Sequence, residues 1–280
     1  MSRWPWAGLA LALAGVSYRI WRLFSYEPII SRYHLPDPAW QGDRPLRLAL
    51  VSDFHSGSGQ WSGEALGKIV LNEEVDALCI AGDLFDAKGG IDEGLSLLTA
   101  LVPHMPVFFV TGNHEESRFD RADMANNLKE MGVAVLDNAG AAVNLAGMRV
   151  EVLGFVDQTA YADRDEWVWA AGLPLKEKAP SASAYRIVLS HRPEQKNFYS
   201  QLQAHLVLAG HAHGGQWRLP VLGGLYAPGQ GLFPRLTRGI YKCGKKHPYQ
   251  MVVSAGFALH PLVPRINNRP ELVIVDIAAL

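Results

Sequence analysis

The feature that most constrains the fold of this 280-residue chain is a series of short apolar runs, each followed by polar residues. Three of them, at residues 46–52, 77–81 and 107–111, are rich in Leu, Val, Ile and Phe and too short for helices, which indicates buried strands. The stretches between them, 63–74 and 91–101, carry apolar residues at helical spacing. The pattern therefore predicts a βαβαβ unit.

The second half of the chain shifts towards strands. Residues 119–131 predict a third helix, and later strands are expected at 141–145, 149–155, 185–190, 206–209, 250–254 and 272–277. The fold class is therefore α/β, and the domain is expected to span residues 46–280 behind a Pro-containing connector at 25–45. Two stretches are expected to be loops or caps over a site: 157–183, with Trp167 and Trp169, and the Gly- and Pro-rich 219–246.

Metal-capable side chains follow the first three expected strands. Asp53 and His55 follow the first strand, and Asp83 follows the second behind a glycine. Asn113 and His114 follow the third. Ligands of open α/β sheets bind beyond the carboxyl ends of the strands, so these side chains stand where a site is expected.

Three further histidines follow later strands. His191 ends the strand at 185–190, and His211 and His213 lie on a glycine-flanked turn after 206–209. Each motif alone is weak, but five of the ten histidines and two aspartates fall at strand ends in order. Mixed oxygen and nitrogen ligands favour Mn, with Fe, Zn, Co or Mg as alternatives, over Ca. The chain has two cysteines, Cys79 and Cys243, which excludes a sulfur-rich metal cluster.

This ordered set of motifs resembles the calcineurin-like metallophosphoesterase superfamily, whose pattern is Asp-x-His, Gly-Asp, Gly-Asn-His-Asp/Glu, a lone His and Gly-His-x-His. The resemblance covers residues 46–277. It implies two mixed β-sheets packed face to face and flanked by helices. Phe54 and Glu115 stand where Leu and Asp are commoner in the superfamily, and neither difference removes a ligand.

The resemblance also implies a role for each polar residue. One divalent cation would be held by Asp53, His55 and His213, a second by Asn113, His191 and His211, and Asp83 would bridge the two. His114 would sit beside the cations without binding them and donate a proton or a hydrogen bond to the leaving oxygen. The alternative for His114 is a structural histidine that orders Asp53.

Such a pair of cations, about 3.5–4 Å apart, supplies a bridging hydroxide for in-line attack on a phosphate ester. The expected function is hydrolysis of a phosphodiester or pyrophosphate bond. A phosphomonoesterase for a soluble substrate and a non-catalytic module are the alternatives, and the complete ligand set argues against the second of these. A net charge of −1 supplies no field for nucleic acid.

Two segments, 213–220 and 265–271, resemble a bacterial, often membrane-associated branch of the superfamily, which favours a lipid-linked substrate. Basic residues cluster after the last histidine motif and could hold a second phosphate or form a solvated face: Arg218, Arg235, Arg238, Lys242, Lys245 and Lys246. The aromatic residues among them, Trp217, Phe233 and Tyr241, could accommodate an acyl chain or pack under a loop.

The first 24 residues predict a segment separate from the domain. Residues 4–18 are uncharged, and Arg19, Arg22 and Arg32 follow. As a helix these fifteen residues would span about 22 Å, short of a bilayer core of roughly 30 Å unless the arginines snorkel. We expect residues 4–24 to contact the membrane, with the domain on the cytoplasmic face of a bacterial inner membrane. A cleaved export signal and a helix packed on the domain are the alternatives.

Overall fold

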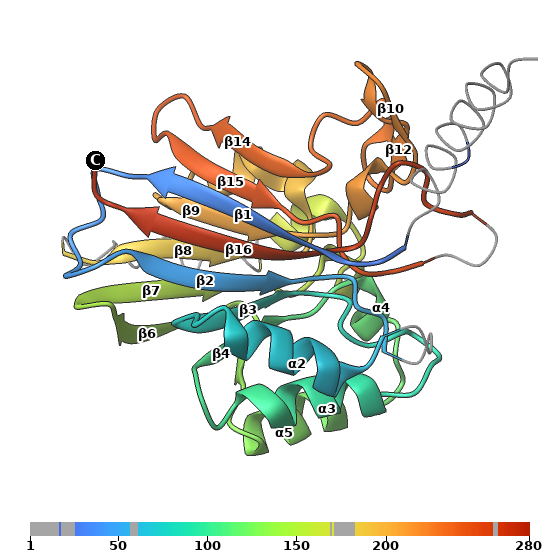
Figure 1. Ribbon diagram of the computed structural model, residues 1–280, viewed down its shortest axis with the longest axis horizontal. Coiled ribbons are helices and arrows are strands. Elements are labelled where there is room, and N and C mark those ends of the chain that lie inside the picture. The colour runs from blue at the N-terminus through green and yellow to red at the C-terminus, as the bar shows by residue number, and fades with distance from the viewer. Residues whose placement is uncertain (1–16, 18–25, 57–60, 169, 171–182, 260–262) are drawn as a thin grey trace, which may run out of the picture.

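The computed structural model describes residues 17, 26–56, 61–168, 170, 183–259 and 263–280. Two six-stranded sheets lie face to face, with helices on the outside (Figure 1). The strands of the first sheet, in spatial order, are β1 (Ile29–Pro36), β16 (Glu271–Ala278), β2 (Leu46–Val51), β3 (Ala77–Ala81), β4 (Val107–Val110) and β5 (Ala134–Val135). Those of the second are β14 (Gly239–Cys243), β15 (Tyr249–Val253), β9 (Leu206–Ala209), β8 (Tyr185–Leu189), β7 (Met148–Gly154) and β6 (Ala139–Leu145).

Both sheets are mixed, as expected from the resemblance. In the first sheet β2, β3 and β4 run parallel, while β16 is antiparallel to β2. In the second, β15, β9, β8 and β7 run parallel and the edge strands β14 and β6 are antiparallel to their neighbours. Side chains from the two inner faces form a common core, exemplified by Leu50 and Cys79 of the first sheet and Ile187 and Val252 of the second.

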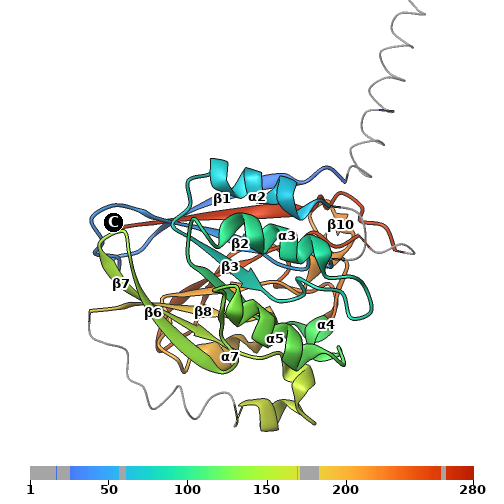
Figure 2. The same cartoon turned by 90° about the horizontal axis from the view of Figure 1, so that it is seen from below.

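Helices α2 (Gly63–Asn72), α3 (Asp92–Leu101) and α5 (Arg121–Glu130) cover the outer face of the first sheet (Figure 2). The side chain of Ser62 caps α2 by accepting a hydrogen bond from the amide of Ala65 at 3.3 Å. Leu66 and Val70 of α2, four residues apart, point into the core on the sheet. The helical spacing of the apolar residues therefore defines which face is buried.

Two expectations about loops are corrected by the structure. Residues 25–45, expected as a connector, contain β1, which pairs with β16 along its whole length. The stretch 219–246 contains β14 and most of two short hairpins, β10 (Arg218–Leu219) with β11 (Gly223–Gly224), and β12 (Tyr226–Ala227) with β13 (Gly231–Leu232). Strand β1 was missed because alternating buried and exposed residues at a sheet edge leave no continuous apolar run.

The described residues include no helix long and apolar enough to cross a membrane. Residues 1–16 and 18–24 of the expected membrane segment lie outside the described part of the chain, as does Trp169. Trp167 is 1% exposed and packs on Phe155 and Phe198, with its indole N–H donated to the carbonyl of Val156 at 2.8 Å. It is therefore a core residue rather than part of a cap.

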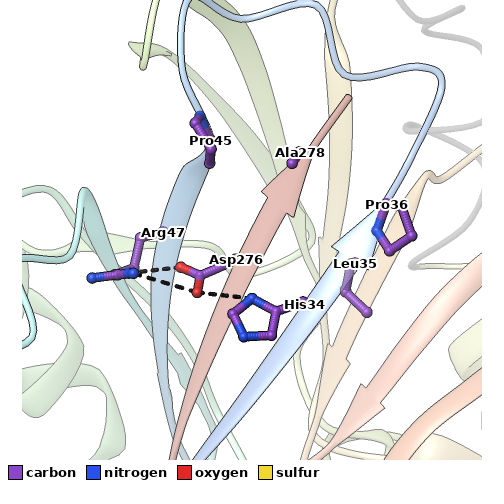
Figure 3. Close-up of a pocket in the computed structure, with 7 residues that line it drawn as sticks. All are labelled: His34, Leu35, Pro36, Pro45, Arg47, Asp276 and Ala278. Atoms are coloured by element: carbon purple, nitrogen blue, oxygen red, sulfur yellow. Dashed lines mark hydrogen bonds and ion pairs between the residues drawn. The ribbon is translucent and has the colours of Figure 1, made fainter. Parts of the chain in front are cut away.

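A pocket of about 270 Å³ is lined by residues at the start of β2 and at the ends of β1 and β16 (Figure 3). Its charged side chains pair with one another, because Arg47 Nε donates to Asp276 at 2.6 Å and His34 Nδ1 lies 3.3 Å from the same carboxylate. The candidate metal residues do not line it. They lie at the opposite end of the strand, beyond Val51.

Candidate metal centre

Seven candidate ligands from five strands meet at one edge of the two sheets. In the first sheet Asp53 and His55 follow β2, Asp83 follows β3, and Asn113 begins the short helix α4 (Asn113–Glu116) after β4. In the second sheet His191 follows β8, and His211 and His213 follow β9. His213 is the first residue of the 3-10 turn η3 (His213–Gly215). Six of the seven candidate ligands, all except Asn113, form two groups. One ligand atom from each of Asp53, His55 and His213 lies within 4.8 Å of the others, and the same holds for Asp83, His191 and His211.

In the second group the rings are held by hydrogen bonds on their far sides. His191 Nδ1 donates to the carbonyl of Ala81 at 2.7 Å, so that Nε2 faces Asp83 Oδ2 at 3.2 Å. His211 Nδ1 lies 3.0 Å from that same Nε2. Two ring nitrogens at this distance need a proton or a cation between them.

Asp83 belongs to the second group and also faces the first. Its Oδ2 is 3.2 Å from His191 Nε2 and 3.6 Å from His55 Nε2, while Oδ1 accepts the backbone N–H of His114 at 2.9 Å. The carboxylate is 1% exposed, so water does not screen these contacts. One carboxylate is thus shared by both clusters of nitrogen ligands.

Two buried polar atoms of the centre have no hydrogen-bond partner within the described chain: His55 Nε2 and Asn113 Oδ1. Leaving such an atom unpaired costs on the order of 1–3 kcal/mol. A carbonyl oxygen and an imidazole lone pair are both donors to a divalent cation. The residues present therefore fit a metal centre of mixed oxygen and nitrogen ligands.

The electrostatics of the buried residues also suit cation binding. Burial opposes the charged forms of Asp83 and His191, but their mutual attraction outweighs it, lowering the pKa of Asp83 and raising that of His191 to about 10. Burial lowers the pKa of His213 to about 4, which keeps its ring neutral near pH 7. A cation that replaced the proton on His191 would preserve the charge balance around Asp83.

His114 stands beside the candidate ligands. Its ring lies edge-on to that of His55, with centroids 4.2 Å apart, and is partly exposed. Its Nδ1 accepts the backbone N–H of Ala87 at 3.2 Å, so the neutral ring carries its proton on Nε2. Burial lowers the pKa of His114. None of its described contacts is with Asp53, so the structure does not support the expectation that it orders that carboxylate.

Asp86 completes a third group with His55 and His114, which the sequence reasoning missed. Its Oδ2 lies 3.4 Å from Nδ1 of His55 and 3.7 Å from Nδ1 of His114. The hydrogen bond with His55 is the main cause of the lowered pKa of Asp86. Because a carboxylate on Nδ1 aims Nε2 at the ligand site, Asp86 is placed to orient His55. A second aspartate three residues after Asp83 was the available sequence signal.

Glu115 braces the loops that carry the ligands. Its buried carboxylate accepts hydrogen bonds from the amides of Asp83 at 2.9 Å, Phe85 at 2.9 Å and Gly112 at 2.8 Å. Burial is the main cause of its raised pKa of about 7. The glutamate noted as a departure in the sequence thus links the loops after β3 and β4.

The candidate ligands have an uncommon backbone conformation, invisible in the sequence. Positive φ angles occur at five of them: Asp53 (50°), His55 (49°), Asp83 (53°), His211 (64°) and His213 (45°). Such angles are uncommon outside glycine and gather at functional sites, where the surrounding structure maintains them. Gly256, also with positive φ, supports this arrangement because a Cβ there would lie 2.6 Å from Cβ of Asp53.

Arg192 is a second residue that sequence reasoning missed. It forms two hydrogen bonds with the buried carboxylate of Asp157, at 2.7 and 3.0 Å, and its Nη1 donates to Nε2 of His211 at 3.2 Å. Asp157 therefore holds the guanidinium of Arg192 at the edge of the centre, beside His211. Its signal in the sequence was a basic residue next to His191.

Comparison with known proteins shows the family of this chain. The family model for calcineurin-like phosphoesterases matches residues 46–215. Phosphodiesterase YaeI of Escherichia coli (strain K12) is 28% identical over 242 residues, covering 83% of this chain and 82% of that protein. The uncharacterized metallophosphoesterase YkoQ of Bacillus subtilis (strain 168) is 25% identical over 236 residues, covering 82% of each chain.

Among solved structures, TT1561 of Thermus thermophilus superimposes with a TM-score of 0.53 at 14% identity, covering 76% of this chain and 90% of that one. At this identity the similarity concerns the fold alone.

Proposed function

Because this chain belongs to the calcineurin-like phosphoesterase family, a class of phosphoric ester hydrolases, we propose that it is a dinuclear metal-dependent enzyme that hydrolyses a phosphodiester or pyrophosphate bond. The observation that carries the proposal is the position of Asp83, whose Oδ2 faces His191 on one side and His55 on the other. A single shared carboxylate is what two adjacent cations would need as a bridge.

In this proposal Asp53, His55 and His213 hold one cation, Asn113, His191 and His211 hold the other, and Asp83 contacts both. Mn is the favoured ion, because the donors mix imidazole nitrogen with carboxylate and amide oxygen. Two bound divalent cations would polarise the phosphoryl oxygens and supply hydroxide near neutral pH.

Three side chains around the ligands would assist the leaving group, orient a ligand and stabilise the phosphoryl charge. The neutral His114 ring carries its hydrogen on Nε2, because Nδ1 accepts the amide of Ala87, and from Nε2 it would donate a hydrogen bond to the leaving oxygen. Transfer of a proton would require the ring protonated on both nitrogens, with Nδ1–H then facing Asp86, and would return the ring to its neutral form. Asp86 would keep His55 oriented, and Arg192 would add positive charge beside the phosphoryl group. The name of the relative YaeI supports the preference for diesters over monoesters.

We extend the proposal to the rest of the chain. Residues 1–24 would form a membrane segment, supported by the uncharged run at 4–18 and the arginines that follow it. The catalytic domain would comprise residues 46–280 together with β1 and would lie on the cytoplasmic face of a bacterial inner membrane. A lipid-linked phosphate ester would then be within its reach.

The proposal is tested by the hydrolysis of an aryl phosphodiester and an aryl phosphomonoester, with and without Mn. Asp83→Asn and His114→Ala should both lose activity, whereas His104→Ala, an exposed histidine outside the centre, should retain it. Faster turnover of the diester would support the bond type. Metal-independent turnover, or equal activity in all three variants, would contradict the assignment.

A further inference from the structure

The two hairpins after the last histidine motif expose large apolar side chains to solvent. Val221 and Leu222, at the tip of the β10–β11 hairpin, are 106% and 63% exposed. On the next hairpin Tyr226 pairs directly with Leu232, and these are 51% and 69% exposed. Phe233 follows at 55%. We call these five residues the hairpin surface.

The backbone presents these side chains outward at a conformational cost. Val221 has a φ of 69° and Phe233 a φ of 51°. Positive φ is a clear outlier for a β-branched residue such as Val221 and uncommon for any residue with a Cβ. A strained, exposed apolar tip is more consistent with a binding surface than with a solvated loop.

The hairpins are anchored on the loop that carries the candidate ligands. Leu225, between the hairpins, donates its amide to the carbonyls of Gly215 at 3.0 Å and Trp217 at 2.8 Å. Gly215 belongs to the turn that begins at His213. Whatever covers the hairpin surface therefore lies at the same end of the molecule as the candidate metal centre.

The amino-terminal part of the chain enters the fold at this same end. Strand β1 begins at Ile29 opposite Glu271, and the Ser31 hydroxyl accepts a hydrogen bond from Arg238 at 3.1 Å, five residues after Phe233. Figure 1 shows the start of β1 on the same side of the molecule as β10 and β12. The uncharged run at residues 4–18 ends eleven residues before β1. The uncharged run therefore connects to the fold at the end that carries the hairpin surface.

The positive charge near the hairpin surface favours an anionic partner. Residues 195–270 include nine Lys and Arg and no Asp or Glu, although the whole chain carries a net charge of −1. Arg235, two residues after Phe233, is exposed and makes no ion pair with a described residue. Glu194 lies beside Gly229 of the second hairpin, but its carboxylate is partly buried and pairs with Arg192 at 3.7 Å. Apolar tips beside an exposed cation such as Arg235 fit the interface of a bilayer with anionic lipids.

We propose that the hairpin surface docks on a lipid bilayer and thereby holds the candidate metal centre against the membrane surface. The inference uses the proposed membrane segment as one of its supports. It goes beyond that proposal, because a tether at residues 4–24 alone would leave the orientation of the domain free.

The test is a fluorescent probe attached to single cysteines in the full chain, reconstituted into vesicles of phosphatidylcholine and phosphatidylglycerol. Cys243→Ser removes the accessible thiol, while Cys79 is buried with a pKa raised to about 12 and is unreactive. Probes are placed by Leu222→Cys on the hairpin surface, by Ser17→Cys in the proposed membrane segment, and by Ile69→Cys on the outside of α2 as the matched apolar control.

We expect the probe at position 222 to shift to the blue, to be quenched by nitroxide lipids and to lose quenching by aqueous iodide. The probe at position 69 should remain open to iodide. In protein labelled through Leu232→Cys, Val221→Glu should reduce the nitroxide quenching, because a carboxylate at the tip opposes entry into the interface.

The other outcomes separate the proposals. Quenching by nitroxide lipids at position 17 but not at 222 would overturn the docking of the hairpin surface and leave the membrane segment intact. Absence of quenching at both positions would overturn both. A probe at 222 that is shielded from iodide before vesicles are added would indicate a protein partner or a second copy, and would also overturn the proposal. Hydrolysis of a soluble aryl ester by Leu222→Cys, which should be unchanged, reports separately on the proposed catalytic function.

Discussion

The Oδ2 atom of Asp83 lies 3.2 Å from Nε2 of His191, and both side chains are almost completely buried. The same oxygen is 3.6 Å from Nε2 of His55, which belongs to the other group of candidate ligands. Asp83 thus belongs to one group and also faces a histidine of the other, so its contribution to metal binding can be compared with that of single histidines.

Asp83→Asn should reduce bound Mn at both positions, whereas His213→Asn and His211→Asn should each mainly affect one. The reason is that only the aspartate faces both groups. Metal content per chain, measured by mass spectrometry after equilibration with limiting Mn, checks this ranking. Equal losses in the three variants would contradict the bridging assignment.

Asp86→Asn should weaken metal binding about 10–100-fold without abolishing it, because its carboxylate orients His55 rather than binding the cation itself. Titration with Mn followed by calorimetry measures the change. Asp92→Asn, at the start of α3 and outside the centre, is the matched control. An affinity equal to that of the control would remove Asp86 from the proposed site.

His114→Ala should lower kcat about 10²–10⁴-fold while metal content is unchanged, since the residue is proposed to give a proton and not to bind metal. The loss should be smaller for an aryl ester with a more acidic phenol, whose leaving oxygen needs less proton donation. A uniform loss across leaving groups, or a loss of bound Mn, would argue that His114 has a structural role.

Asp157→Ala should lower the free energy of unfolding by about 3 kcal/mol, because it leaves the mostly buried Arg192 without its main partner. Urea denaturation measures the effect, with the exposed Asp165→Ala as control. The double change Asp157→Leu with Arg192→Met should recover part of the stability. Equal stability of Asp157→Ala and the control would mean that the ion pair contributes little.

The pH dependence of stability should contain a contribution from His205. Burial lowers the pKa of this ring, which stacks on Tyr185 and accepts the amide of Arg186 at 2.8 Å. Folding favours the neutral form of His205. Its contribution to the free energy of unfolding is therefore present above the pKa of the unfolded chain, about 6.5, and is lost as the pH falls towards the lower pKa of the folded state. Denaturation in saturating Mn between about pH 7 and 5 should therefore show a shallower slope for His205→Gln. Parallel slopes for the two proteins would contradict this.

The apolar runs predicted the main strands of both sheets, because parallel strands that are buried on both faces are apolar at every position. Strands such as Ala77–Ala81 and Leu206–Ala209 have the bounds expected from sequence. The sequence did not predict β1, because an edge strand needs apolar residues only at alternate positions. It did not predict the short hairpins either, because their two-residue strands need hardly any apolar residues. Helix α5 begins at Arg121 rather than 119, which leaves Phe119 fully exposed before it.

The sequence by itself determined which residues could bind a metal, since the polar side chains follow apolar runs and runs of that kind form adjacent strands. The resemblance implied that Asp83 bridges the two cations, whereas the tertiary structure supplied the distances from Asp83 to His191 and His55 and placed Asp86 and Arg192 beside the ligands. These relations depend on distances across strands far apart in the chain and on positive φ angles at the ligands. Local propensity carries no information about either, because packing between the two sheets fixes them both.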